Sequence, residues 1–144
     1  MKKRIAAFTA LLLCTLGAWL FIVTPRERQA RAKVNQEVFD TIKRDSAWDM
    51  KSRMLYGYFF VSEHRTPLRV LGAILQISGH RFVGIREDEE NGKYWLHVEE
   101  IDIHDLDSIS ARDVRLKRLG KIIFGSEYDG WDVGPDLTPT KSNR

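Results

Sequence analysis

The sequence predicts an α+β domain of the ferredoxin-like type, in which strands and helices follow one another in the order β-α-β-β-α-β. Three observations lead to this prediction. Aromatic and β-branched runs recur from residue 54 to residue 135, two amphipathic helical segments separate them, and an Asn-Gly pair marks a hairpin in the middle. The chain has 144 residues, and the part that follows its apolar N-terminal segment suffices for one domain with a core.

The domain, predicted over residues 51–135, begins with a strand and a helix. Residues 54–61 are aromatic and β-branched and predict the strand. Thr66 and Pro67 open the helix, and Gly79 closes it. The apolar side chains of this helix recur at helical spacing: Leu68, Leu71, Ile74 and Leu75.

A hairpin follows, with strands predicted at residues 81–86 and 93–103 around a turn at residues 88–92. A bulge near residues 99–100 is also predicted, because an extra residue reverses the face on which the later side chains lie. The evidence for it is a change of apolar phase in the second of these strands, from Leu96 and Val98 to Ile101 and Ile103.

A second helix and a terminal strand complete the plan. The helix is predicted at residues 107–124, with apolar side chains at Ile109, Leu116, Leu119 and Ile123. Tyr128 and Trp131 then alternate with acids and glycines, and a Gly-Pro pair ends the strand at Pro135. Large amphipathic aromatics at this point predict that the last strand closes the sheet, and Gly130 predicts either a close approach of the backbone or a bend.

An uncharged apolar run from Ile5 to Val23 predicts a membrane-spanning helix, and we assign residues 1–24 to this anchor. The lipid bilayer is thus an expected partner, and the expected location is the bacterial inner (cytoplasmic) membrane, crossed once. A cleaved secretory signal and lipidation at Cys14 are the alternatives. Basic residues flank the run on both sides, so the sequence does not decide on which side of the membrane the domain lies.

Residues 25–50 are highly charged and predict a juxtamembrane helix. Its narrow apolar stripe favours packing on the domain over self-association, because a coiled coil needs about three or four heptads. The stripe consists of Val34, Val38, Phe39 and Ile42. At the other end of the chain, residues 136–144 are polar and predict a disordered tail.

Charge argues against a nucleic-acid-binding role. The chain is formally +3, with 23 basic and 20 acidic residues, but Lys2, Lys3 and Arg4 supply the excess. From residue 25 on, basic and acidic residues balance, so the domain has no net field that attracts phosphate. No direct nucleic-acid partner is expected.

The residue types offer little chemistry. The domain has no cysteine and no recognisable nucleophile motif, and the 4 histidines show no metal-ligand spacing. Glu99, Glu100 and Asp102 can supply an acid–base pair, although strand carboxylates more often face solvent or pair with helix arginines. We therefore expect no enzymatic activity, no metal and no cofactor.

Four segments together resemble a known family. They are residues 56–61, 79–85 and 94–99, and the motif Tyr-Asp-Gly-Trp at residues 128–131. As a set, over residues 55–135, they are similar to the bacterial ribonuclease E inhibitor family, the regulators of ribonuclease activity B. The resemblance implies a small non-catalytic α+β domain that binds a ribonuclease E-like endonuclease and so regulates RNA decay.

Two other functions remain open, namely an anchored accessory domain with an unknown protein target and an RNA-binding module. An RNA recognition motif shares the β-α-β-β-α-β plan and displays aromatics on its first and third strands. The third strand here lacks the basic-Gly-aromatic pattern of such modules, which favours protein binding. The aromatics at comparable positions are Tyr56, Tyr58, Tyr94 and Trp95.

The surface expected to bind a protein partner combines acids with aromatics. Acids steer a basic target, and aromatics supply binding energy. The candidate residues are Glu87, Asp88, Glu89 and Glu90 at the hairpin turn, Tyr58 and Trp95 on the strands, and Tyr128, Asp129 and Trp131 in the terminal strand.

Overall fold

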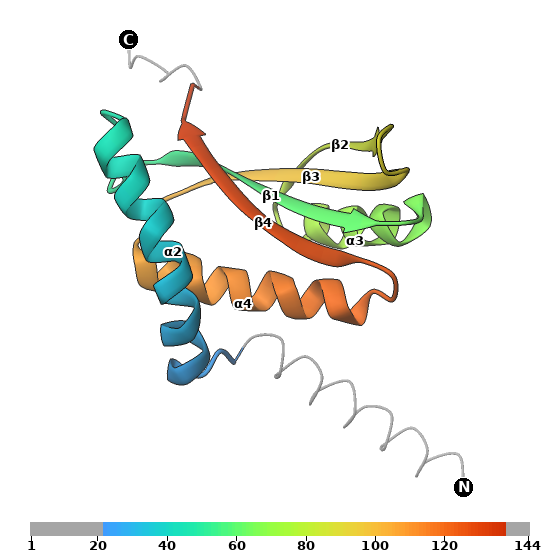
Figure 1. Cartoon of the computed structure of the whole chain (residues 1–144), viewed down its shortest axis with the longest axis horizontal. Coiled ribbons are helices and arrows are strands. Elements are labelled where there is room, and N and C mark those ends of the chain that lie inside the picture. Colours follow the sequence, from blue (N-terminus) through green and yellow to red (C-terminus); the bar gives the residue numbers. More distant parts are fainter. Residues whose placement is uncertain (1–21, 138–144) are drawn as a thin grey trace, which may run out of the picture.

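The computed structural model describes residues 22–137 (Figure 1). Within this range the chain forms three helices and one four-stranded antiparallel sheet, which is an α+β fold. From β1 onward the order is the predicted β-α-β-β-α-β. In chain order the elements are α2 (Pro25–Asp45), β1 (Met54–Ser62), α3 (Arg65–Ile77), β2 (Arg81–Asp88), β3 (Lys93–Asp102), α4 (Leu106–Ile122) and β4 (Glu127–Pro135).

The sheet has the strand order β2-β3-β1-β4, and every neighbouring pair is antiparallel. α3 links β1 to β2, and β3 lies between these two strands, as in the split β-α-β unit of the ferredoxin-like plan. β1 and β3 are the two central strands. Each of them therefore has a neighbouring strand on both sides. Tyr58 of β1 and Glu100 of β3, which form the centre of a polar network, lie on these two strands.

The core lies between one face of the sheet and the helices. Side chains alternate along a strand, so Tyr56 and Phe60 of β1 and Val98 of β3 share the face that the helices cover. Figure 1 shows α3 and α4 on the same side of the sheet, with α2 crossing one end of α4. The opposite face is covered by no described helix, and there Phe59 stacks on His97 with ring centroids 4.6 Å apart.

The predicted bulge in β3 is wrong. β3 pairs with β1 without a register shift along its whole length. Glu100 therefore follows Leu96 and Val98 onto the helix-covered face, while Ile101 lies on the open face and is 38% exposed. The change of apolar phase in the sequence reflects a carboxylate placed beside the core and not an extra residue.

Irregular pairing occurs on the outer strands instead. Phe59 pairs with Gly130 of β4 but Phe60 pairs with Tyr128, so Asp129 has no residue of β1 opposite it. Gly130 has a φ of +142°, which residues with a Cβ rarely adopt. Of the two alternatives predicted at Gly130, the bend is thereby confirmed.

α2 begins at a capping box and packs along α4. The Thr24 hydroxyl accepts a hydrogen bond from the Glu27 backbone N–H, and the Glu27 carboxylate accepts one from the Thr24 N–H at 3.0 Å. Pro25 occupies the first turn, where its missing N–H costs nothing. The prediction that this helix packs on the domain is confirmed by its contact with α4.

The apolar stripe predicted for α2 is right only in part. Phe39 is buried and Ile42 packs against the core, but Val34 and Val38 are 52% and 38% exposed. The buried face passes through Asn35 instead. This side chain is 1% exposed and is tolerated there because its amide is hydrogen-bonded within the domain.

The predicted membrane-spanning segment, residues 5–23, lies outside the described residues apart from Ile22 and Val23. These two residues are not helical, and the Ile22 carbonyl accepts a hydrogen bond from Arg118 Nη1 at 2.9 Å. Across residues 22–137 no helix combines the length and the apolar character that crossing a membrane requires. This finding contradicts the predicted inner-membrane localisation, which we do not retain. The alternative N-terminal signals and most of the predicted tail also lie outside the described part of the chain.

Phe39→Ala tests whether α2 belongs to the folding unit. We expect the free energy of unfolding to fall by about 3–5 kcal/mol, the usual cost of deleting a buried phenyl ring. The adjacent but partly exposed Val38→Ala serves as the control and should cost less than about 1 kcal/mol. Urea denaturation of the full chain measures both values. Equally small losses would show that α2 adds nothing to the core.

Candidate functional site

The acids predicted to bind a partner lie at the β2–β3 hairpin. Glu87 is near the end of β2, Glu89 and Glu90 are in the turn, and all three are exposed. Asp88 serves the turn itself, because its carboxylate accepts from the Glu90 N–H at 3.0 Å and from the Asn91 amide at 2.7 Å. Three of the four acids are thus accessible to a partner.

Two of the predicted contact aromatics are buried, which corrects the expectation that they face a partner. Tyr58 is 0% exposed and Tyr128 is 8% exposed. Both lie on the face of the sheet that the helices cover. The Tyr58 hydroxyl donates to Glu100 and the Tyr128 hydroxyl donates to Asp113, so burial leaves neither hydroxyl unsatisfied.

The other three predicted residues take separate positions. Trp95 is partly exposed on the open face of β3, and Asp129 is exposed at the irregularity in β4. Trp131 is partly buried, since its ring packs on Phe39 with centroids 6.0 Å apart and its Nε1 donates to Asn35 at 3.2 Å. The predicted residues therefore do not form one surface, and only Trp95 lies on a strand next to the hairpin acids.

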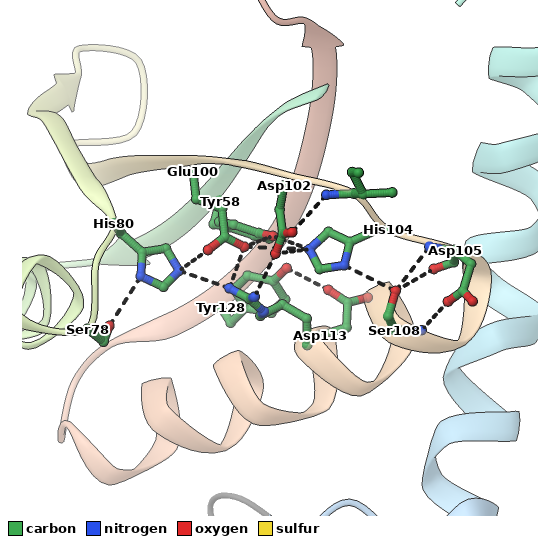
Figure 2. A network of polar contacts seen from close by, with 12 residues as sticks. Tyr58, Ser78, His80, Glu100, Asp102, His104, Asp105, Ser108, Asp113 and Tyr128 are labelled. Atoms are coloured by element: carbon green, nitrogen blue, oxygen red, sulfur yellow. Dashed lines mark hydrogen bonds and ion pairs between the residues drawn. The ribbon is translucent and has the colours of Figure 1, made fainter. Parts of the chain in front are cut away.

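A polar network that the sequence did not predict lies between the sheet and the helices (Figure 2). At its centre the Glu100 carboxylate accepts a hydrogen bond from the Tyr58 hydroxyl at 2.9 Å and forms an ion pair with Arg112 of α4. The Glu100 side chain is 16% exposed and that of Arg112 is 19% exposed. Because little solvent screens the pair, it ties α4 to the centre of the sheet.

His80, just before β2, enters the network as a neutral side chain. Its Nδ1 lies 3.2 Å from the Leu75 carbonyl oxygen, which can only accept, so this nitrogen carries the proton. Nε2 is then the acceptor and faces Arg112 Nη1 at 3.4 Å. Burial lowers the pKa of His80, and the nearby Glu100 carboxylate opposes this shift only in part. His80 therefore adds no positive charge at neutral pH.

Three residues around the end of β3 have the arrangement of metal ligands. Glu100, Asp102 and His104 each offer one ligand atom, and these atoms lie within 4.8 Å of one another. However, Arg112 forms ion pairs with both carboxylates and already supplies the positive charge at this point. A metal ion would have to displace the guanidinium, so we assign no metal to the cluster.

The network keeps Glu100 ionised and Tyr58 protonated at neutral pH. Burial alone raises the pKa of Glu100, but His104, Arg112 and Tyr58 outweigh it and lower that pKa from 4.5 to about 2. Burial and the neighbouring carboxylate raise the pKa of Tyr58. Neither group exchanges a proton near neutral pH, so the pair acts as a structural tie and not as an acid–base couple.

A second buried cluster joins α2, α4 and β4. Asp113 of α4 accepts a hydrogen bond from the Tyr128 hydroxyl at 2.5 Å and forms an ion pair with Arg31 of α2, also at 2.5 Å. Beside it, the Asn35 amide donates to the Ser110 hydroxyl at 3.1 Å. Asp113 and Asn35 are each 1% exposed. These contacts hold α2 against α4 and the β4 edge of the sheet.

A cleft of about 380 Å³ opens beside the first network, between α3 and α4. Its volume lies within the range of small-ligand sites, about 300–1,000 Å³. Polar side chains from the network border it, and apolar side chains of the two helices form its walls. The lining residues include His80, Arg112, Arg115, Ile74, Leu75, Leu116 and Leu119. The cleft and the hairpin acids are the two candidate binding regions.

The sequence contained one signal for the polar network. Glu100, Asp102 and His104 alternate, and alternate residues of a regular strand share one face. The expectation that strand carboxylates pair with helix arginines is confirmed for Glu100 and Asp102, because both pair with Arg112. His80 gave no comparable signal, since its role depends on how β2 and α4 pack.

Glu100→Gln tests the network, because the amide keeps the shape of the side chain but leaves Arg112 without its partner. We expect the free energy of unfolding at pH 7 to fall by on the order of 3 kcal/mol. The folded state lowers the pKa of Glu100, so its contribution is fully present above pH 4.5 and is lost as the pH falls toward about 2. The difference between wild type and variant, measured by urea denaturation, should shrink over that range.

The exposed Glu37→Gln on α2 is the control for this experiment and should behave like wild type at each pH. A difference between wild type and Glu100→Gln that stays constant down to pH 2 would show that the carboxylate charge is not the stabilising feature.

Comparison with known families agrees with the resemblance noted in the sequence. The family model for regulator of ribonuclease activity B matches residues 32–133. The matched range includes most of α2, nearly all of β4 and every element between them. No curated protein matches the chain at a significant level. Because the family model covers well over half of the sequence, the chain belongs to the family of regulators of ribonuclease activity B.

Proposed function

We propose that the protein binds a ribonuclease E-like endonuclease and inhibits it, and thereby regulates RNA decay without cutting RNA itself. The observation that carries this proposal is the family match over residues 32–133, since the family is that of regulators of ribonuclease activity. Two features of the described residues support the proposal. They are the ion pairing and protonation of the buried polar groups, and the exposed acids at the hairpin.

The buried polar groups support a binding role over a catalytic one. Within residues 22–137, Arg112 forms ion pairs with both Glu100 and Asp102, the carboxylates that lie beside His104. Tyr58 stays protonated because burial raises its pKa. Groups held in this way stabilise the fold and are not poised to activate a nucleophile.

The proposed contact region is the hairpin surface, which we define as Glu87, Glu89, Glu90 and Trp95. The acids are exposed and lie together at and beside one turn, where they can steer a basic partner and raise its association rate. Trp95 pairs with Arg86 of β2 and offers partly exposed aromatic area next to them. This combination supplies both steering and contact energy.

The contacts of the aromatic residues argue against the RNA-binding alternative. Tyr56 and Tyr58 are 0% exposed on the helix-covered face, so they cannot stack on bases. The open face does carry Phe59 against His97, but the Glu99 carboxylate lies 3.3 Å from His97 Nε2. Glu99 is also ion-paired with Arg81, so this part of the face has no excess positive charge to attract the phosphates of a bound strand.

Titration of the full-length chain against a purified ribonuclease E-like endonuclease tests the proposal. We expect the cleavage rate of a fixed RNA substrate to fall and to level off at a fixed molar ratio, because a binding inhibitor acts stoichiometrically. The chain alone should leave the RNA intact. If neither binding nor a change of rate appears at about micromolar concentrations, the target is a different protein, as in the accessory-domain alternative.

Charge reversal of Glu87, Glu89 and Glu90 to lysine tests the hairpin surface. We expect the association rate with the endonuclease, measured by stopped flow, to fall about tenfold at low salt and less at high salt, because salt screens exposed charges. A matched control makes the same change of net charge on α2, at Glu37, Asp40 and Asp45. An equal loss in both variants would assign the effect to overall charge and remove the hairpin from the interface.

A further inference from the structure

The cleft between α3 and α4 has an apolar floor and an accessible apolar rim. Leu75 and Leu116 are 2% and 4% exposed, while Ile74 on α3 is 38% exposed. Ile77, near the end of the same helix, is 90% exposed and adds to its apolar surface. An apolar ligand chain can therefore reach the floor from solvent and exclude water from these side chains.

Two arginines of α4 line this cleft, and only the first of them forms ion pairs with described residues. Arg112 forms ion pairs with both Glu100 and Asp102. Arg115, one turn later, is partly buried and has no hydrogen bond or ion pair with another described residue. Burial lowers the pKa of Arg115 and the positive charges of Arg112 and Arg28 lower it further, while the Glu100 carboxylate opposes this shift without forming an ion pair. Among the described residues that line the cleft, Arg115 is thus a guanidinium with no ion pair.

This charge distribution selects for a particular anion. A carboxylate fits the planar guanidinium through two parallel N–H···O hydrogen bonds. One guanidinium without an ion pair matches a single anionic group, and His80 adds no second cation because burial lowers its pKa. A carboxylate monoanion therefore suits the site better than inorganic phosphate, and the apolar walls suit an alkyl chain attached to it.

We propose that the cleft between α3 and α4 binds an amphiphilic carboxylate of the fatty-acid type, with the carboxylate on Arg115 and the alkyl chain between the leucines of the two helices. The cleft volume of about 380 Å³ is that of a small-ligand site. The cleft shares no residue with the hairpin surface. Ligand binding and nuclease binding can therefore be measured separately.

Isothermal titration of the full-length chain with decanoate, kept below its micellar concentration, tests this proposal. We expect saturable binding at one site that weakens about tenfold or more in Arg115→Gln. The matched control, Lys117→Gln, removes an exposed charge from the same helix and should leave the affinity unchanged. Arg115→Lys keeps the charge but loses the paired hydrogen bonds, so its affinity should lie between those of wild type and Arg115→Gln. Circular dichroism establishes that each variant is folded.

Related probes separate the contributions of charge and chain. Decyltrimethylammonium carries an alkyl chain of similar length with the opposite charge and should not bind. Acetate and inorganic phosphate lack the chain and should not compete with decanoate. Absence of decanoate binding, unchanged binding by Arg115→Gln, or competition by phosphate would each overturn the proposal. None of these measurements involves a nuclease, so failure here would leave the proposed function untouched.

Discussion

The partly buried ion pair between Glu100 of β3 and Arg112 of α4 is the interaction on which the rest of the structure depends. Withdrawing two charges from water is costly unless other hydrogen bonds complete the pair, and here Tyr58 donates to the same carboxylate. The pair holds α4 across the centre of the sheet, and one turn further along this helix Arg115 lines the cleft. Asp113, on the same helix, binds α2 through Arg31. α4 is therefore the element that connects the sheet, the cleft and α2.

Most of the fold could be predicted from the sequence, because the signals act over a few residues. The helical spacing of apolar residues, the Asn-Gly turn and the Gly-Pro pair before the tail each correspond to an element of the structure. The side of the sheet on which Glu100 lies could not be predicted, since a bulge and a buried carboxylate produce the same change of apolar phase. The ion pair with Arg112 of α4, which no local sequence pattern indicates, decides between the bulge and the buried carboxylate. Likewise Asn35, and not Val34, faces the core because its hydrogen-bond partners come from other elements.

The candidate site was less predictable than the fold, for a related reason. The hairpin acids are recognisable because a turn keeps them in solvent whatever the tertiary structure. Tyr58 and Tyr128 have a chemistry that suits an interface and a core equally well, and only their position relative to the helices places them inside. Nothing in the sequence indicated the role of Arg115, because its lack of an ion pair among the described residues depends on every element packed around the cleft. We propose the exposed acids and the guanidinium of Arg115 as two separate binding regions of the domain.

A double-mutant cycle on Glu100 and Arg112 tests most directly whether their pair holds the domain together. It compares the free energies of unfolding of wild type, Glu100→Gln, Arg112→Gln and the double variant by urea denaturation at pH 7. Either single variant breaks the pair, so the second substitution should add little, and the coupling energy should be about 2 kcal/mol or more. Additive effects, with a coupling energy below about 0.5 kcal/mol, would show that α4 is held on the sheet without this pair.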